Sequence, residues 1–176
     1  IRNEFLIENV FIPDEISLVY SLYDRYMVGG AMPVKVALRL EPADDLKSTY
    51  FLERREMGMI NTGGNAIVEA DGTIYNIGHK EALYLGMGTK EVLFRSADAN
   101  APAKLYINSA PAHHPYPSKK VTIREAEVVV LGTPEESNHR TINKLLINKV
   151  LPTCQLQMGM TELKPGSVWN TMPVHT

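Results

Sequence analysis

The groups in this chain best suited to catalysis or metal binding are its five histidines, because a single cysteine, Cys154, excludes an internal disulfide and a cysteine-only metal cluster. His113 and His114 are adjacent, and neighbouring side chains on an extended backbone point to opposite sides, which disfavours a shared ion. His79 follows a glycine, and His139 follows Ser and Asn, as turn residues do. We interpret these four as exposed loop or linker histidines.

The fifth histidine, His175, follows a run of strand-like residues. Residues 165–166 are Pro-Gly, which is a turn signal, and the Val and Trp residues after them suit an extended edge strand. Pro173 argues against a central strand or the middle of a helix. Taken alone, a single histidine at the end of such a strand is interpreted as exposed rather than as a metal ligand.

Two further segments match parts of the short motifs with which cupin barrels bind metal. Glu56 and a following glycine have the spacing of the glutamate and glycine in the first motif, yet Tyr50 and Leu52 occupy its two histidine positions. In the second motif, Glu91 occupies the histidine position. The pattern predicts a cupin-like barrel without metal, its core formed by residues 49–94. Spacing alone leaves a plain β-sandwich equally open.

The elements that carry these residues are predicted to be β-strands. Twelve glycines and 11 prolines divide the chain into short pieces rich in Val, Ile, Tyr and Leu, with little helical periodicity. Asp71-Gly72 predicts a type I′ hairpin, because both central positions of that turn need a positive φ. Residues 137–147 are ambiguous, and we favour an extended structure. The other expected strands are 5–12, 17–26, 33–40, 49–53, 57–61, 66–70, 73–77, 83–85, 91–94, 105–108, 121–131 and an alternating segment at 153–163.

A change of composition after residue 108 indicates a domain boundary. Residues 109–120 hold three prolines and are predicted to form an extended connection. The short strands and glycine turns before them suggest a closed barrel or a sandwich. The predicted domains are a metal-free cupin-like barrel at 1–110, a Pro-rich linker at 111–120 and the start of a second barrel at 121–176.

Composition describes an ordinary globular protein of one or two small domains: 176 residues, 44% of them hydrophobic, with a net charge of −2. The charge argues against nucleic acid as a partner, and no basic helical segment supports a helix-turn-helix regulator. No apolar run approaches the roughly 20 residues that span a bilayer, and residues 1–4 show no feature of a signal peptide. We therefore expect a cytoplasmic protein without a membrane partner.

A resemblance to a known family rests on eight runs that follow one another over nearly the whole chain. They are Arg-Asn-Glu-Phe-Leu at 2–6, Val-Gly-Gly at 28–30, Tyr-Phe-Leu-Glu-Arg-Arg-Glu at 50–56, Pro-Ala-Lys at 102–104, Ala-Pro-Ala-His at 110–113, Arg-Thr-Ile-Asn-Lys at 140–144, Thr-Cys-Gln-Leu at 153–156 and Trp-Asn-Thr-Met-Pro-Val-His-Thr at 169–176. Together they resemble the 5-keto-4-deoxyuronate isomerases, pectin-degradation enzymes of the cupin superfamily. Their order along the chain makes this match far more specific than the cupin spacings.

The resemblance implies an all-β bicupin, built on the double-stranded β-helix, whose second barrel is truncated in this chain. It implies a zinc-dependent ketol isomerase, which converts the small molecule 4-deoxy-L-threo-5-hexosulose uronate to 3-deoxy-D-glycero-2,5-hexodiulosonate through an enediol. His175 matches the first of four zinc ligands, three His and one Glu, and the others are expected beyond Thr176. A homo-oligomer is expected, as in other bicupin enzymes.

The substrate carboxylate needs a cationic partner, and the shared run at 140–144 supplies Arg140 and Lys144. Their interpretation as solvated surface charges stays open, and no residue is assigned to proton transfer. The alternative function is a non-catalytic β-barrel module that binds a sugar acid. Metal analysis of the full-length protein distinguishes the two functions.

Overall fold

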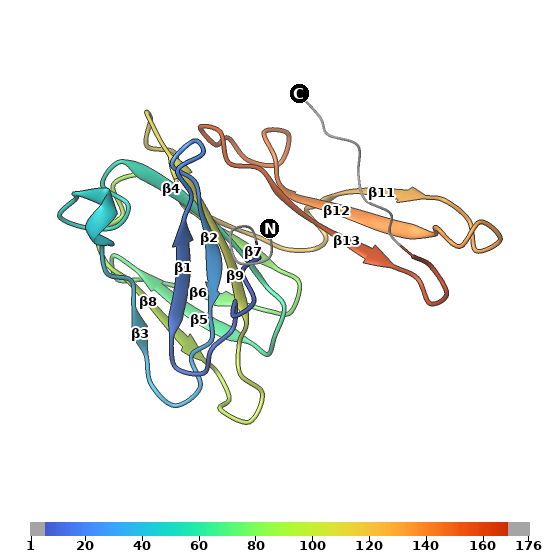
Figure 1. The fold of residues 1–176 in the computed structure, drawn as a ribbon, viewed down its shortest axis with the longest axis horizontal. Helices are drawn as coiled ribbons and strands as arrows, with labels where there is room; N and C mark the ends of the chain where they lie inside the picture. Colours follow the sequence, from blue (N-terminus) through green and yellow to red (C-terminus); the bar gives the residue numbers. More distant parts are fainter. Residues whose placement is uncertain (1–5, 169–176) are drawn as a thin grey trace.

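Three antiparallel β-sheets make up the fold (Figure 1). The structure is a computed structural model and describes residues 6–168. Within that range the only helical element is the short 3-10 turn η1, Asp44–Leu46, and no helix has the length and apolar character needed to cross a membrane. The prediction of an all-β chain is therefore confirmed. The strands are β1 Ile16–Tyr20, β2 Met27–Ala31, β3 Leu38–Arg39, β4 Arg55–Asn61, β5 Ala66–Ala70, β6 Thr73–Ile77, β7 Ala82–Leu85, β8 Val92–Ser96, β9 Leu105–Pro111, β10 Lys119–Val121, β11 Glu127–Leu131, β12 Arg140–Leu146 and β13 Met158–Leu163.

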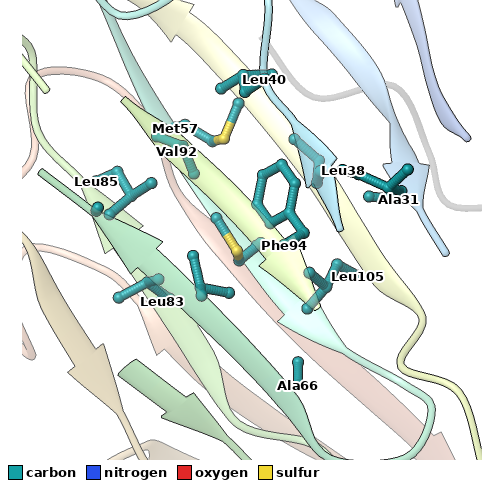
Figure 2. Packing of buried hydrophobic residues seen from close by; sticks show 14 of the residues in the cluster. Ala31, Leu38, Leu40, Met57, Ala66, Leu83, Leu85, Val92, Phe94 and Leu105 are labelled. Carbon is teal, nitrogen blue, oxygen red and sulfur yellow. The ribbon is translucent and has the colours of Figure 1, made fainter. Parts of the chain in front are cut away.

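Two of the sheets face each other and enclose the main hydrophobic core. The six-stranded sheet has the order β1-β2-β9-β4-β7-β10, and the four-stranded sheet has the order β3-β8-β5-β6. Phe94 on β8 is fully buried in this core, close to Leu38 of its own sheet and Leu105 of the facing sheet (Figure 2). Burying a side chain of this size contributes roughly 1.5–3 kcal/mol, so the apolar contact between the sheets holds them together.

Strand β4 is buried on both of its faces. Met57 and Met59 belong to the main core, whereas Gly58 and Ile60 face the other side of the sheet, as the alternation of a strand requires. A second hydrophobic core covers that outer side. Its buried residues are Ile60, Ala82, Tyr84, Ala110, Val121, Leu145, Leu146, Leu151, Leu156 and Met158.

The third sheet, with the order β11-β12-β13, projects from the side of the other two (Figure 1). Leu145 and Leu146, at the end of β12, are fully buried in the second core and anchor this sheet. Farther out, Val128 and Val130 on β11 are 50% and 59% exposed. The outer part of the sheet therefore has no covering layer within residues 6–168.

The predicted Asp71-Gly72 hairpin is confirmed. Asp71 and Gly72 have φ of 46° and 79°, and the strands on either side, β5 and β6, begin and end at the predicted residues. The Asp71 carboxylate also accepts hydrogen bonds from the backbone N–H groups of Lys90 and Glu91. The extended structure favoured for 137–147 is confirmed as well, because β12 lies within it.

The strand predictions for the first 30 residues are only partly correct. Residues 6–12 contain no strand, and the strand predicted at 17–26 ends at Tyr20. Asp24 and Arg25 both have positive φ and turn the chain into β2, which was not predicted. Glycine is uncommon in strands, so the Gly-rich sequence of β2 did not indicate one. The structure requires glycine at position 29, because a Cβ there would lie only 1.8 Å from the Ser17 carbonyl oxygen of β1.

Carboxylates that accept hydrogen bonds from turn amides explain the other wrong strands. Asp14 Oδ1 accepts hydrogen bonds from three successive backbone N–H groups, 34–36, so that the strand predicted at 33–40 shrinks to the two residues of β3. Glu53 accepts from the backbone of Thr49, and residues 49–53 form turns. Such side-chain contacts offer the backbone an alternative to a sheet ladder.

The strands predicted at 121–131 and 153–163 are also longer than the observed ones. Glu125 accepts hydrogen bonds from the backbone and hydroxyl of Thr122, which separates β10 from β11. In the last segment only β13 forms a strand. β10 pairs with β7 and so belongs to the six-stranded sheet, while residues 112–118 connect it to β9 outside any strand. The division at 111–120 remains a prediction.

The connection at 112–118 lies close against the end of β7. Gly86 N donates a hydrogen bond to Ser118 Oγ, and a Cβ at Gly86 would lie 1.9 Å from the Tyr116 carbonyl oxygen. We expect Gly86→Ala to lower the free energy of unfolding by about 1–3 kcal/mol in urea denaturation, because backbone atoms must move apart. Gly78→Ala is the control, since its Cβ would meet only the Glu81 side chain. Equal stability of the two variants would contradict this close approach.

Candidate functional site

Strand β12 presents Arg140 and Lys144 on the same face, because they are four residues apart. Arg140 is half-buried, and its Nη1 donates a hydrogen bond to the Asn138 carbonyl oxygen at 3.0 Å. Its register partners are Leu131 on β11 and Leu163 on β13. The two predicted substrate-binding residues therefore lie on the same face of the projecting sheet, with Ile142 between them.

Lys144 forms part of a charge cluster that the sequence prediction missed. Its Nζ lies 3.0 Å from Glu127 Oε1, and Lys149 Nζ lies 2.6 Å from Glu127 Oε2. Lys149 first, and then Lys144, hold the pKa of the Glu127 carboxyl below its ordinary value. A substrate carboxylate at Lys144 would have to compete with Glu127. The pair was not predictable without the register, in which Glu127 stands directly opposite Lys144.

On β12 and β13, a second polar cluster ties the projecting sheet to the six-stranded one. Glu162 accepts a hydrogen bond from Asn143 Nδ2 at 2.9 Å and forms an ion pair with Lys80, in the turn between β6 and β7. The Lys80 ammonium holds the pKa of the Glu162 carboxyl below its ordinary value. This cluster fixes where β12, and with it Arg140, lies relative to the main core.

Glu56 is fully buried on the outer side of the six-stranded sheet and accepts four hydrogen bonds. Its Oε1 accepts from Gln155 N at 2.8 Å and Leu156 N at 2.7 Å, and its Oε2 accepts from Cys154 N at 2.8 Å and the Tyr84 hydroxyl at 2.7 Å. Burial, and then the bond to Glu56, raise the pKa of Tyr84 above its ordinary value. One carboxylate thus holds the segment that leads into β13.

The two cupin-like spacings do not converge on one site. Glu56 faces the second core, while Glu91 is exposed and forms an ion pair with Arg39 at 2.7 Å. Tyr50 and Leu52 lie in turns rather than on a strand, so counting back from Glu56 does not reach strand positions. The histidine positions of the first motif therefore fall in the turns before β4, where the strand predicted at 49–53 does not form.

Within residues 6–168, no group of three or more His, Cys, Asp and Glu side chains could hold a metal ion. His113 and His114 are exposed, as predicted, and His79 Nδ1 lies 3.1 Å from the Gly63 carbonyl oxygen. The donor set of the described part therefore does not by itself fit zinc. His175 lies outside the described residues.

Comparison with known proteins places this geometry in a family. The profile of the KduI/IolB family matches residues 8–176, nearly the whole chain. The chain belongs to the KduI/IolB family. The family resemblance predicted from the eight runs is thereby confirmed.

Within the family, two similar relatives share one name. The chain is 63% identical over 175 residues to the 4-deoxy-L-threo-5-hexosulose-uronate ketol-isomerase of Bacteroides fragilis YCH46, covering 99% of this chain and 62% of the relative. It is 56% identical to the protein of the same name from Escherichia coli SMS-3-5, covering 100% and 64% of the two chains. The chain thus spans less than two thirds of the length of these relatives.

Among solved structures, an IolB-like protein from Salmonella typhimurium LT2 matches with a TM-score of 0.61 and 18% identity. The match covers 81% of this chain and 53% of that structure. Identity at this level speaks to the fold alone. It agrees with the predicted cupin-like, all-β class.

Proposed function

We propose that this chain is part of a ketol isomerase that converts 4-deoxy-L-threo-5-hexosulose uronate to 3-deoxy-D-glycero-2,5-hexodiulosonate in uronate degradation. The observation that carries the proposal is the 63% identity to a relative of that name over 99% of the chain. The names of the relatives favour this function over the binding module. A cytoplasmic homo-oligomer is part of the proposal, and light scattering of the purified protein tests the assembly.

The reaction moves a carbonyl along the carbon chain, so the site must stabilise an enediolate and transfer a proton. We propose zinc as the cofactor, with His175 as one ligand; bound zinc would act as a Lewis acid toward the enediolate oxygens. The residues described here do not supply its other ligands. Their contribution is to hold β12 and β13 in place through Glu56 and Glu162.

The proposal is tested by incubating the purified full-length protein with the substrate and following the carbon skeleton by NMR. Appearance of the 2,5-diketone at a rate proportional to enzyme concentration supports it. Saturable binding of the uronate without turnover, in protein that contains stoichiometric zinc, would favour the non-catalytic binding module. Absence of both binding and turnover would contradict each of the two functions.

Arg140 is our choice for the residue that binds the substrate carboxylate. Its planar guanidinium can donate two parallel hydrogen bonds to a carboxylate, a geometry that the single ammonium of Lys144 on the same face lacks. We expect Arg140→Ala to lower kcat/KM by roughly 10- to 100-fold, mainly through KM, as expected when a hydrogen bond to a charged group worth about 1.5–3 kcal/mol is lost.

Lys144→Met is the matched variant on the same face. We expect a smaller rise in KM than in Arg140→Ala, because the Lys144 ammonium forms an ion pair with Glu127. Steady-state kinetics of the full-length enzyme provide the measurement. Unchanged KM and kcat in Arg140→Ala would remove Arg140 from the substrate site and leave it as a residue of the sheet surface.

A further inference from the structure

An arginine is buried at one end of the main core without an ion pair to any carboxylate of residues 6–168. Arg55, the first residue of β4, is only 5% exposed and lies on the core-facing side of the strand with Met57 and Met59. Its Nε donates a hydrogen bond to Ser109 Oγ at 3.1 Å, and an Nη donates to the Ser109 carbonyl oxygen at 2.8 Å. Within residues 6–168 no ion pair neutralises it.

The charge of Arg55 is therefore buried and only partly hydrogen-bonded. A guanidinium has five N–H donors, and the two bonds to Ser109 leave three of them for another partner. Desolvation lowers the pKa of Arg55 to about 10, which reflects the cost of keeping this cation away from water. A buried charge of this kind is normally paired, so an anionic partner would remove a cost that the fold now carries.

Space for such a partner exists beside the guanidinium. A cavity of about 220 Å³ is lined by Arg55 together with Arg25 from the β1–β2 turn and Arg54. Ser48, also in the lining, has a buried hydroxyl oxygen with no hydrogen-bond partner. The cavity thus combines three cations with one carboxylate, Asp45, and an unsatisfied hydroxyl, and Phe51 adds an apolar wall.

Arg54 shows how the cavity wall is held in place. Its Nη2 donates hydrogen bonds to the carbonyl oxygens of Leu46 at 2.9 Å and Lys47 at 2.8 Å, which fixes the end of η1 beside the start of β4. Ser48 follows directly after these two residues. The loop that carries the unsatisfied hydroxyl is therefore hydrogen-bonded to the residue directly before Arg55.

We propose that this cavity is a binding site for a small sugar acid, with its carboxylate on Arg55 and a hydroxyl on Ser48. A guanidinium can hold a carboxylate through two parallel hydrogen bonds, and the Phe51 ring suits the apolar face of a sugar. The volume lies below the roughly 300–1,000 Å³ of drug-sized sites, as a single small acid requires. Asp45 in the lining opposes a second negative charge, which favours a monoanion over a phosphate dianion.

The site goes beyond the proposed isomerase reaction, because neither Arg140 nor Lys144 lines it. It is tested by isothermal titration calorimetry of the full-length protein, treated with EDTA so that zinc-dependent binding is removed. The probes are D-galacturonate, D-galactose, which has a hydroxymethyl group in place of the carboxylate, and inorganic phosphate. We expect galacturonate to bind and galactose to give no heat of binding.

Three arginine variants locate the binding. Arg55→Met keeps an unbranched apolar stem, removes the charge and should weaken galacturonate binding at least tenfold. Arg25→Gln, an exposed residue at the rim, should weaken it about two- to fivefold through the lost attraction. Arg124→Gln, exposed and outside the cavity lining, should leave it unchanged. Circular dichroism checks that each variant is folded. If Arg55→Met does not fold, the proposal is tested by Arg25→Gln and Ser48→Ala, both of which should bind galacturonate more weakly than the wild type.

Three results would overturn the proposal. The first is no binding of galacturonate by the wild type at millimolar concentration. The second is equal affinity in the wild type, Arg25→Gln and Ser48→Ala. The third is phosphate binding as tight as galacturonate binding, which would indicate a general anion site. Because no turnover is measured and zinc is absent, failure of the isomerase proposal leaves each of these outcomes unaffected.

Discussion

Replacing Glu56 with alanine is expected to lower the free energy of unfolding by roughly 3–5 kcal/mol, since three backbone N–H groups and the Tyr84 hydroxyl lose their acceptor in a buried site. The loss should be concentrated where Glu56 holds the chain. We therefore expect the amides of residues 154–156 to exchange with deuterium much faster in the variant, while the strands of the main core keep their protection. Urea denaturation and hydrogen exchange measure the two effects.

Two further variants remove part of the hydrogen bonding of Glu56 and should lower the free energy of unfolding by smaller amounts. Tyr84→Phe removes one of the four donors and should cost about 1 kcal/mol. Glu56→Gln keeps one acceptor oxygen but places an NH2 group against N–H donors, so its cost should fall between the other two. If Glu56→Ala kept normal protection at residues 154–156, apolar packing of Leu156 and Met158 in the second core would be what holds this segment.

His175→Ala in the full-length protein is expected to lower both zinc content and isomerase turnover, the latter by at least about 100-fold. The basis is the proposal that zinc is the cofactor and that His175 is one of its ligands. Loss of a direct ligand should exceed the roughly 10- to 100-fold effects of residues that only orient ligands. Metal analysis by mass spectrometry and steady-state kinetics provide the measurements.

The main core should stay folded in this variant, because none of its buried residues lies near position 175 in the sequence. An unfolding curve like that of the wild type is the control that separates metal loss from misfolding. Arg124→Gln, an exposed change, should keep normal zinc and turnover. Stoichiometric zinc and normal turnover in His175→Ala would show that other residues bind the metal.

Local sequence patterns were sufficient for elements whose structure depends on local interactions. The Asp71-Gly72 turn needs only two residues that tolerate positive φ between alternating strands, and β5 and β6 follow from it. Patterns failed where an acceptor far along the chain reshaped the backbone. Asp14 accepts hydrogen bonds from amides 20–22 residues away and turns a β-like segment into an irregular one.

The all-β class and the family could be predicted from the sequence alone, because strand periodicity, turn residues and the order of the short runs are properties of the chain. Only the tertiary structure decided what each polar side chain does. Glu56 and Arg55 are neighbours on β4, yet one faces residues about 100 positions later and the other faces a cavity beside the main core. The physical reason is that successive strand residues point to opposite faces, and what covers each face depends on contacts between distant segments.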